Sequence, residues 1–181
     1  MDATEMRRYV EAEFAGVRTT EAYGDTFFLY DPDGDLPPER QMPFATIVTG
    51  DHYEKVSKLD GRDAYRLNIG LTKATYTAMF GDPPTERDAD GVLATGYDQT
   101  AEDTLMPHPV YGSQYWVCVV NPGAATLPAV RSLLAEAHDY AARKHANHRR
   151  RAGRADHPAR WRRQGRPFWA RRSCRRAWRN W

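Results

Sequence analysis

The chain has 181 residues, of which 41% are hydrophobic and 28% are charged, and this composition suits one domain with a single core. Its longest apolar run is far shorter than the roughly 20 residues of a membrane-spanning helix, and its first residues lack the pattern of a secretion signal. Two cysteines are too few for a disulfide framework. We therefore expect a soluble protein of the reducing cytoplasm that has no membrane partner.

The net charge of +2 is an average over two unlike segments. Residues 1–148 hold 23 acidic and 13 basic side chains, a net −10, whereas residues 149–181 hold 13 arginines and one acid, a net +12. Such an asymmetry is typical of a folded domain joined to a charged tail. We predict one domain over residues 1–148, followed by a disordered tail that is rich in arginine and tryptophan.

The first predicted elements are a helix and two strands. Asp2 and Glu5 have the spacing of a capping box, which predicts a helix from this point to about Phe14. A strand rich in β-formers is expected over residues 26–30, before a strong turn signal. A second strand is expected over residues 44–49.

The second half of the domain alternates strands with helices. Residues 65–69 alternate as a strand does, with Tyr65, Leu67 and Ile69 facing inward and Arg66 and Asn68 facing outward. A short helix follows to about Phe80, with Thr72 as its cap. The apolar residues 115–120 predict a central strand covered on both faces, and residues 126–145 predict the closing helix. These elements describe an α+β domain with an antiparallel sheet.

Four motifs occur in an order that resembles a known but uncharacterised family. They are Glu-Ala-Tyr-Gly-Asp-Thr-Phe-Phe at 21–28, Tyr-Arg-Leu-Asn-Ile-Gly at 65–70, Pro-His-Pro-Val-Tyr at 107–111 and Trp-Val-Cys-Val-Val-Asn-Pro at 116–122. On these motifs the chain resembles the domain of unknown function 6194 family of high-GC bacteria, over roughly residues 9–144. The resemblance implies a fold, and it implies no catalytic, binding or cofactor residues.

The order of elements has a weaker, topological resemblance to MmcQ/YjbR-like domains. That resemblance implies a double-wing fold of the kind found in DNA-binding proteins. However, the net −10 of residues 1–148 repels phosphate, which disfavours DNA binding by the domain itself.

Most residues that are able to carry chemistry lie before the apolar strand. His108 stands between two prolines, which stiffen its backbone. A carboxylate from Asp98 or Asp103 would fix the tautomer of His108 and raise its basicity, as general-base chemistry requires. Tyr111 and Trp116 would line a cleft beside it. The alternative is that His108 only binds a loop carbonyl and that both acids are solvated.

Arg66 and Asn68 are suited to binding a carboxylate or a phosphate. Nucleotide binding, thiol chemistry and metal binding find little support in the sequence. No nucleotide-binding motif is present, and Cys118 lies in an apolar strand, where burial makes a thiol inert. No known metal-site spacing occurs among the available ligands, so we expect no metal and no cofactor; these ligands are His52, His108, Asp98 and Asp103.

Three functions follow from these observations and remain open at this point. The first is a non-enzymatic binding module for a small molecule or a protein, which uses Arg66, Asn68, His108, Tyr111 and Trp116. The second is a small acid–base enzyme that uses His108 with Asp98 or Asp103. The third is non-specific nucleic-acid binding by the tail, through arginine–phosphate contacts and stacking on tryptophan. The tail composition is also that of GC-rich codons, which is typical of a frameshifted or read-through end.

Overall fold

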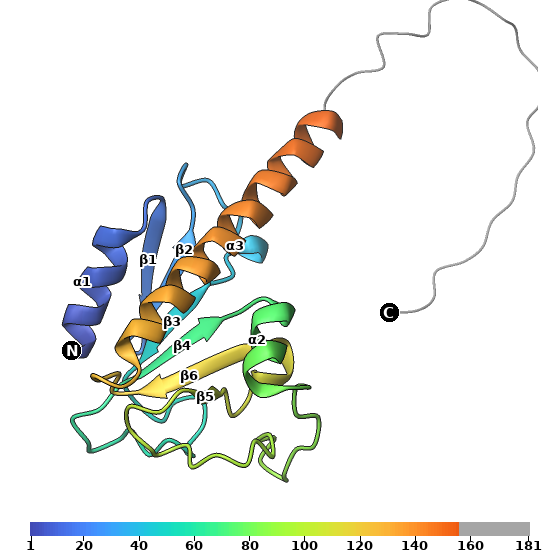
Figure 1. Ribbon diagram of the computed structural model, residues 1–181. Helices are drawn as coiled ribbons and strands as arrows, with labels where there is room; N and C mark the ends of the chain where they lie inside the picture. Colours follow the sequence, from blue (N-terminus) through green and yellow to red (C-terminus); the bar gives the residue numbers. More distant parts are fainter. Residues whose placement is uncertain (156–181) are drawn as a thin grey trace, which may run out of the picture.

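The computed structural model describes residues 1–155, and their centre is one sheet of six strands (Figure 1). All neighbouring strands pair antiparallel, in the spatial order β1-β2-β3-β4-β6-β5. With three α-helices beside this sheet, the predicted α+β class is confirmed. The strands are β1 (Val17–Ala22), β2 (Asp25–Tyr30), β3 (Ala45–Val48), β4 (Arg66–Gly70), β5 (Met106–Pro107) and β6 (Trp116–Val120).

The three α-helices begin where the sequence predicts them, whereas the two 3-10 helices were not predicted. No helix within residues 1–155 is long and apolar enough to cross a membrane. The α-helices are α1 (Ala3–Glu13), α2 (Lys73–Phe80) and α3 (Leu127–Ala155), and two short 3-10 helices are η1 (Pro38–Arg40) and η2 (Gly112–Gln114).

Side chains close the first turns of α1 and α2. The Asp2 carboxylate accepts from the amide of Glu5 at 2.7 Å, and the Glu5 carboxylate accepts from the amide of Asp2 at 3.0 Å. The hydroxyl of Thr72 accepts from the amide of Thr75 at 3.2 Å. These bonds satisfy amides that the helices cannot pair internally. Because the capping residues lie three positions apart, the sequence predicts where both helices start.

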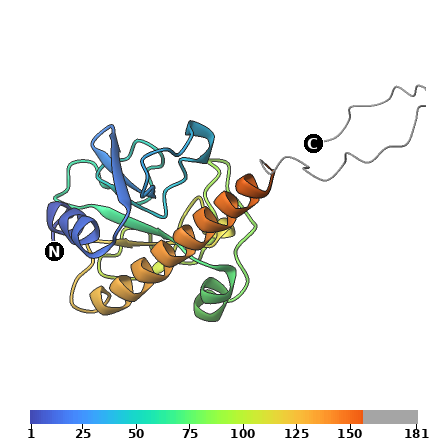
Figure 2. The ribbon, with the colours of Figure 1, turned by 90° about the horizontal axis from the view of Figure 1, so that it is seen from above.

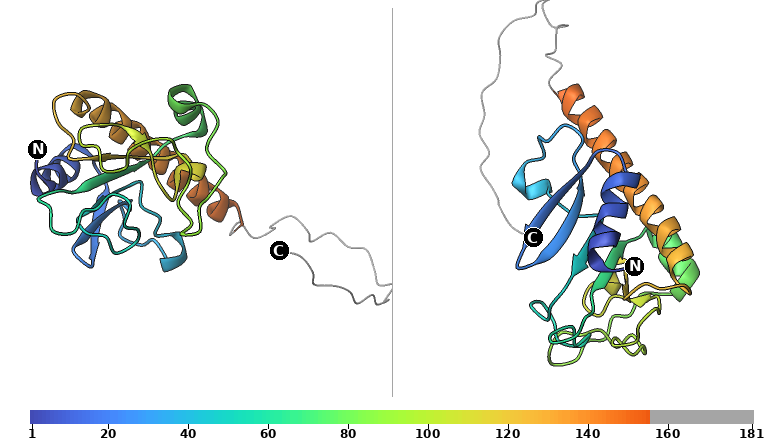
Figure 3. Two further views of the ribbon diagram at one scale, coloured as in Figure 1. Left: turned by 90° about the horizontal axis from the view of Figure 1, so that it is seen from below. Right: turned by 90° about the vertical axis from the view of Figure 1, so that its left-hand side faces the viewer.

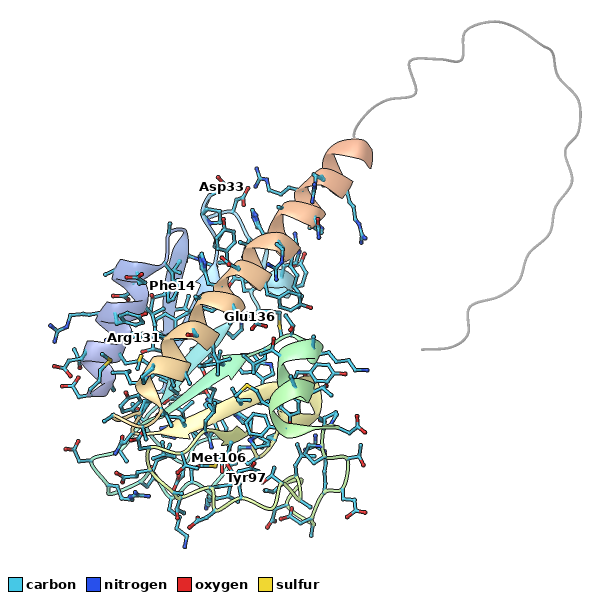
Figure 4. The ribbon with its side chains drawn as sticks, in the orientation of Figure 1. Phe14, Asp33, Tyr97, Met106, Arg131 and Glu136 are labelled. Atoms are coloured by element: carbon cyan, nitrogen blue, oxygen red, sulfur yellow. The ribbon has the colours of Figure 1, made fainter. Side chains whose placement is uncertain are left out.

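α1 and α3 pack on the same face of the sheet and enclose the main core (Figure 2). Phe14 lies between the two helices, and its ring centroid is 5.1 Å from that of His138 on α3 (Figure 4). Full burial of one such side chain contributes about 1.5–3 kcal/mol, so this layer supplies a large share of the folding free energy. The core includes Met6, Val10, Phe28, Ile47, Tyr65, Leu67, Ile69, Val117, Val119, Val130, Leu133, Leu134 and Ala137.

Strand β1 was not predicted, although it pairs with β2 along its full length. The two strands are joined at Tyr23 and Gly24, whose φ angles of 56° and 87° place both residues in the left-handed region. A two-residue hairpin turn of this kind usually carries Asn-Gly or Asp-Gly. Because Tyr-Gly is not such a signal, the hairpin could not be recognised from the sequence.

Two long connections, instead of helices, cover the second face of the sheet. They are residues 49–65, before β4, and residues 81–105, before β5, where Tyr97 is labelled in Figure 4. Arg66 and Asn68 lie on this face, as their alternation predicts, but only 1% and 3% of their surfaces are exposed. The predicted alternation is therefore correct, but the outward side of β4 is not open to solvent, because Glu54 and Ser57 from the first connection cover Arg66.

Helix α3 continues well beyond the sheet (Figure 3). The predicted domain boundary at residue 148 falls within this helix, which ends at Ala155. Arg149 pairs with Asp33 and Asp35 at 3.1 and 2.9 Å, and both arginine and alanine favour helix. The rest of the predicted tail, residues 156–181, lies outside the described residues.

We expect a chain that ends at Ala155 to unfold cooperatively, with a melting temperature within a few degrees of the full chain. The reason is that the core lies between Ala3 and Ala141, whereas residues 156–181 contain no leucine, isoleucine or valine. Circular dichroism melts of the two chains test this. A chain that ends at Gly123, and so lacks α3, should show no cooperative transition. Early or gradual melting of the chain that ends at Ala155 would contradict the prediction.

Candidate ligand-binding site

A cavity of about 290 Å³ lies on the second face of the sheet. It brings together the five residues that the sequence suggests for binding, Arg66, Asn68, His108, Tyr111 and Trp116. Apolar and aromatic side chains form most of its wall, with a few polar groups fixed among them, as in many small-molecule sites. The other lining residues are Phe27, Met42, Pro43, Thr46, Val48, Tyr53, Glu54, Val110 and Gln114.

Arg66 organises the polar floor of this cavity. Its guanidinium forms an ion pair with Glu54, and Nη1 also donates to the Ser57 hydroxyl at 2.6 Å. Nε donates to Oδ1 of Asn68 at 2.9 Å, and Nδ2 of Asn68 donates to the Thr46 hydroxyl at 2.9 Å. The side chains of Arg66 and Glu54 are 2% and 6% exposed, so the two charges neutralise each other away from water. Most of the hydrogen-bonding capacity that the sequence assigned to an anionic ligand is therefore already used.

Glu54 and Ser57 were not among the predicted site residues. They lie in a connection without regular structure, where neither periodicity nor a motif marks them. The one signal for them was Arg66 itself, since a guanidinium buried in a sheet requires a carboxylate partner.

His108 closes the turn between β5 and η2. Its amide donates to the carbonyl of Trp116 at 2.9 Å, which extends the pairing of β5 with β6. Its ring Nδ1 accepts from the amides of Val110 and Tyr111 at 3.0 and 3.1 Å. Because Nδ1 is an acceptor, the neutral ring carries its proton on Nε2.

Nε2 of His108 is a donor that the protein leaves unpaired. It forms no hydrogen bond with any residue in 1–155, yet it is not sealed from solvent, although only 3% of the residue is exposed. Since His108 lines the cavity, this access leads into it. Burial, followed by the nearby charge of Arg66, holds the pKa of His108 well below its usual value, so the ring is neutral at pH 7.

Trp116 forms one end of the cavity. It pairs with Gly70 across β4 and β6, and a Cβ at Gly70 would lie 3.1 Å from two indole carbons. Only glycine lets the indole pack this closely on the neighbouring strand. Tyr111 lies at the mouth, with 47% of its surface exposed and its ring centroid 5.0 Å from that of His108.

The structure does not bring Asp98 or Asp103 to His108. The Asp98 carboxylate accepts from the amide and the hydroxyl of Thr100, at 2.9 and 2.7 Å. The Asp103 carboxylate accepts from the amides of Gly123, Ala125 and Thr126 at the start of α3. No hydrogen bond within residues 1–155 joins either acid to His108, so the acid–base pair that the sequence suggests is not formed.

Neither Cys118 nor a small cluster of possible metal ligands adds a reactive group. Burial raises the pKa of the Cys118 thiol to about 12, which keeps it protonated and unreactive, as predicted. Within residues 1–155, Asp33, Asp35 and His145 are close enough together to hold a metal ion. Arg149 already pairs with both of these carboxylates, so the cluster is an ion-pair network.

The sequence model of a family of unknown function (DUF6194) matches residues 1–151 of the chain. The match includes the whole sheet and every residue that lines the cavity. Comparisons with curated proteins and with solved structures found no match. The resemblance to MmcQ/YjbR-like domains therefore stays a prediction.

Replacement of Arg66 by methionine should reduce stability by about 3–5 kcal/mol, because Glu54 then keeps a buried charge without its cationic partner. The double variant Arg66→Met/Glu54→Gln removes both charges and should recover part of this loss. Urea unfolding of Arg66→Met, Glu54→Gln and the double variant measures the coupling energy between Arg66 and Glu54. If the losses of stability in the two single variants added up to that of the double variant, the ion pair would not hold residues 49–65 on the sheet.

Replacement of Asp103 by asparagine should lower stability at pH 7. Hydrogen bonds from Thr126 and the neighbouring amides lower the pKa of Asp103 from 3.8 to about 2, so the stabilisation is complete above about pH 4 and is lost as the pH falls toward 2. The difference in the free energy of unfolding between the native chain and Asp103→Asn, measured with urea, should shrink over that pH range. Asp98→Asn is the matched control, since Asp98 binds only Thr100, and the corresponding difference should be smaller. A difference for Asp103→Asn that does not change with pH would contradict the assignment.

Proposed function

We propose that this chain, which belongs to the family of unknown function DUF6194, is a non-enzymatic module that binds a small molecule beside His108. The observation that carries the proposal is the unpaired Nε2–H donor of His108, which has access to the cavity. No residue in 1–155 accepts from Nε2–H, and the donor is accessible from the cavity, so an acceptor on a molecule that enters the cavity can pair with it directly. An oxygen or a ring nitrogen of a ligand would be that acceptor.

The walls of the cavity favour a small, uncharged and largely apolar ligand. Its volume of about 290 Å³ is at the lower end of the range of small-molecule sites. Phe27, Val48, Val110 and Trp116 offer apolar or aromatic contact. The Arg66–Glu54 pair has no net charge and His108 is neutral, so the site has little net charge to attract an ion.

The same geometry favours binding over catalysis. Nδ1 of His108 is occupied by two backbone amides, and no carboxylate in residues 1–155 bonds to the ring. A general base needs a free lone pair directed at its substrate, and His108 directs an N–H toward the cavity instead.

We also place the protein in the cytoplasm, as its cysteine content predicts.

A thermal-shift screen of uncharged metabolites tests the proposal on the full chain, since a ligand that binds only the folded state raises its melting temperature. Each compound that raises it is then titrated by calorimetry against the native chain and two His108 variants. We expect at least one compound to bind with a stoichiometry of one.

The two variants separate the roles of the two ring nitrogens. His108→Asn keeps an acceptor near Nδ1 for the amides of Val110 and Tyr111 but removes the donor at Nε2, so it should melt like the native chain and bind about tenfold more weakly. His108→Gln places an amide N–H near Nε2 but leaves the two backbone amides unpaired, so it should lose about 1–3 kcal/mol of stability and still bind. If His108→Asn bound every compound as tightly as the native chain, the proposed site would be wrong.

A further inference from the structure

A second hollow, with a volume of about 530 Å³, lies on the helical face of the protein. It is bounded by η1 and the segment after it, by the start of α2 and by the middle of α3, which Figure 1 shows passing beside η1. Its floor contains the buried side chains of Phe44, Leu71 and Ala137, and its walls include Tyr115 and Tyr140. We call this hollow the α3 groove.

Cations from three different elements surround this apolar floor. They are Arg40 from η1, Lys73 from α2 and Lys144 from α3, while Glu39 is the one carboxylate that lines the α3 groove. None of the three cations forms an ion pair with a residue in 1–155. Nζ of Lys144 lies 4.3 Å from the ring centroid of Tyr140, which holds the ammonium at the rim.

This concentration of positive charge runs against the composition of the domain. Residues 1–148 carry a net −10 and contain four lysines, of which two line the α3 groove. The other two, Lys55 and Lys58, are exposed in the connection over the opposite face. Like charges brought together beside an apolar floor repel one another, and an anion seated between them relieves that repulsion.

We propose that the α3 groove binds a small amphipathic anion, whose apolar part lies on Phe44, Leu71 and Ala137 and whose charged group lies between Lys73 and Lys144. Charge complementarity and the apolar floor together select this class over an uncharged molecule or an inorganic anion. The site is separate from the His108 cavity, with which it shares only one wall, and it does not depend on the function proposed for that cavity.

The probe for this site is octanoate, with octan-1-ol as the uncharged compound of the same length. Each is titrated into the uniformly ¹⁵N-labelled full chain at pH 7.5, and amide shifts are followed by NMR. We expect octanoate to saturate shifts at Leu71 and Tyr140, and to bind more tightly than octan-1-ol. Raising the salt concentration should weaken the binding of octanoate and leave that of octan-1-ol unchanged.

Matched lysine variants decide whether the charges act locally. Lys73→Gln/Lys144→Gln should weaken octanoate binding on the order of tenfold, whereas Lys55→Gln/Lys58→Gln, with the same change in net charge, should leave it within about twofold. All four lysines are outside the buried core, so both double variants should melt like the native chain. Equal effects of the two double variants, equal affinity for octan-1-ol, shifts centred on Glu54 and Arg66, or no saturable binding would each overturn the proposal.

Discussion

A guanidinium charge buried against the middle of a sheet constrains the structure on that side. Arg66 lies on β4, between β3 and β6, and its carboxylate partner Glu54 comes from an irregular connection. The loss of hydration of both charges is offset only when the pair is complete, so this connection must lie on the sheet in one arrangement. Loops, instead of a second layer of helices, therefore close this face, and the His108 cavity lies between the anchored connection and the segment that carries His108.

A second carboxylate connects the two faces of the sheet. Asp103 belongs to the connection that leads to β5, yet it accepts four hydrogen bonds from Gly123, Ala125 and Thr126 where α3 begins. The loops of one face and the main helix of the other are thus held by the same side chain. The His108 cavity and the α3 groove lie on opposite faces of the sheet. They share one wall, which consists of Met42, Pro43, Gln114 and Trp116.

Local interactions account for what the sequence predicts well, and distant ones for what it misses. The sequence predicts the start of α1 because Asp2 and Glu5, three residues apart, bond to each other's amides. It predicts the alternation of β4 because the inward side of that strand packs on one continuous core. The partner of Arg66 is twelve residues away in a segment without periodicity, so burial of Arg66 was not foreseen. The five residues that the sequence suggests for binding do gather at one cavity, but the nearness of Asp98 and Asp103 to His108 along the chain is misleading. Their oxygens are taken by backbone amides that no sequence pattern connects to them.

The position of Trp116 has an optical consequence. It is the one tryptophan in residues 1–155, and the other four, Trp161, Trp169, Trp178 and Trp181, all follow that segment. Its indole belongs to the wall that both cavities share, and it packs closely against Gly70 of the neighbouring strand. Tryptophan emission from residues 1–155 therefore arises at a single point between the two cavities, where the polarity around the indole depends on what occupies either side.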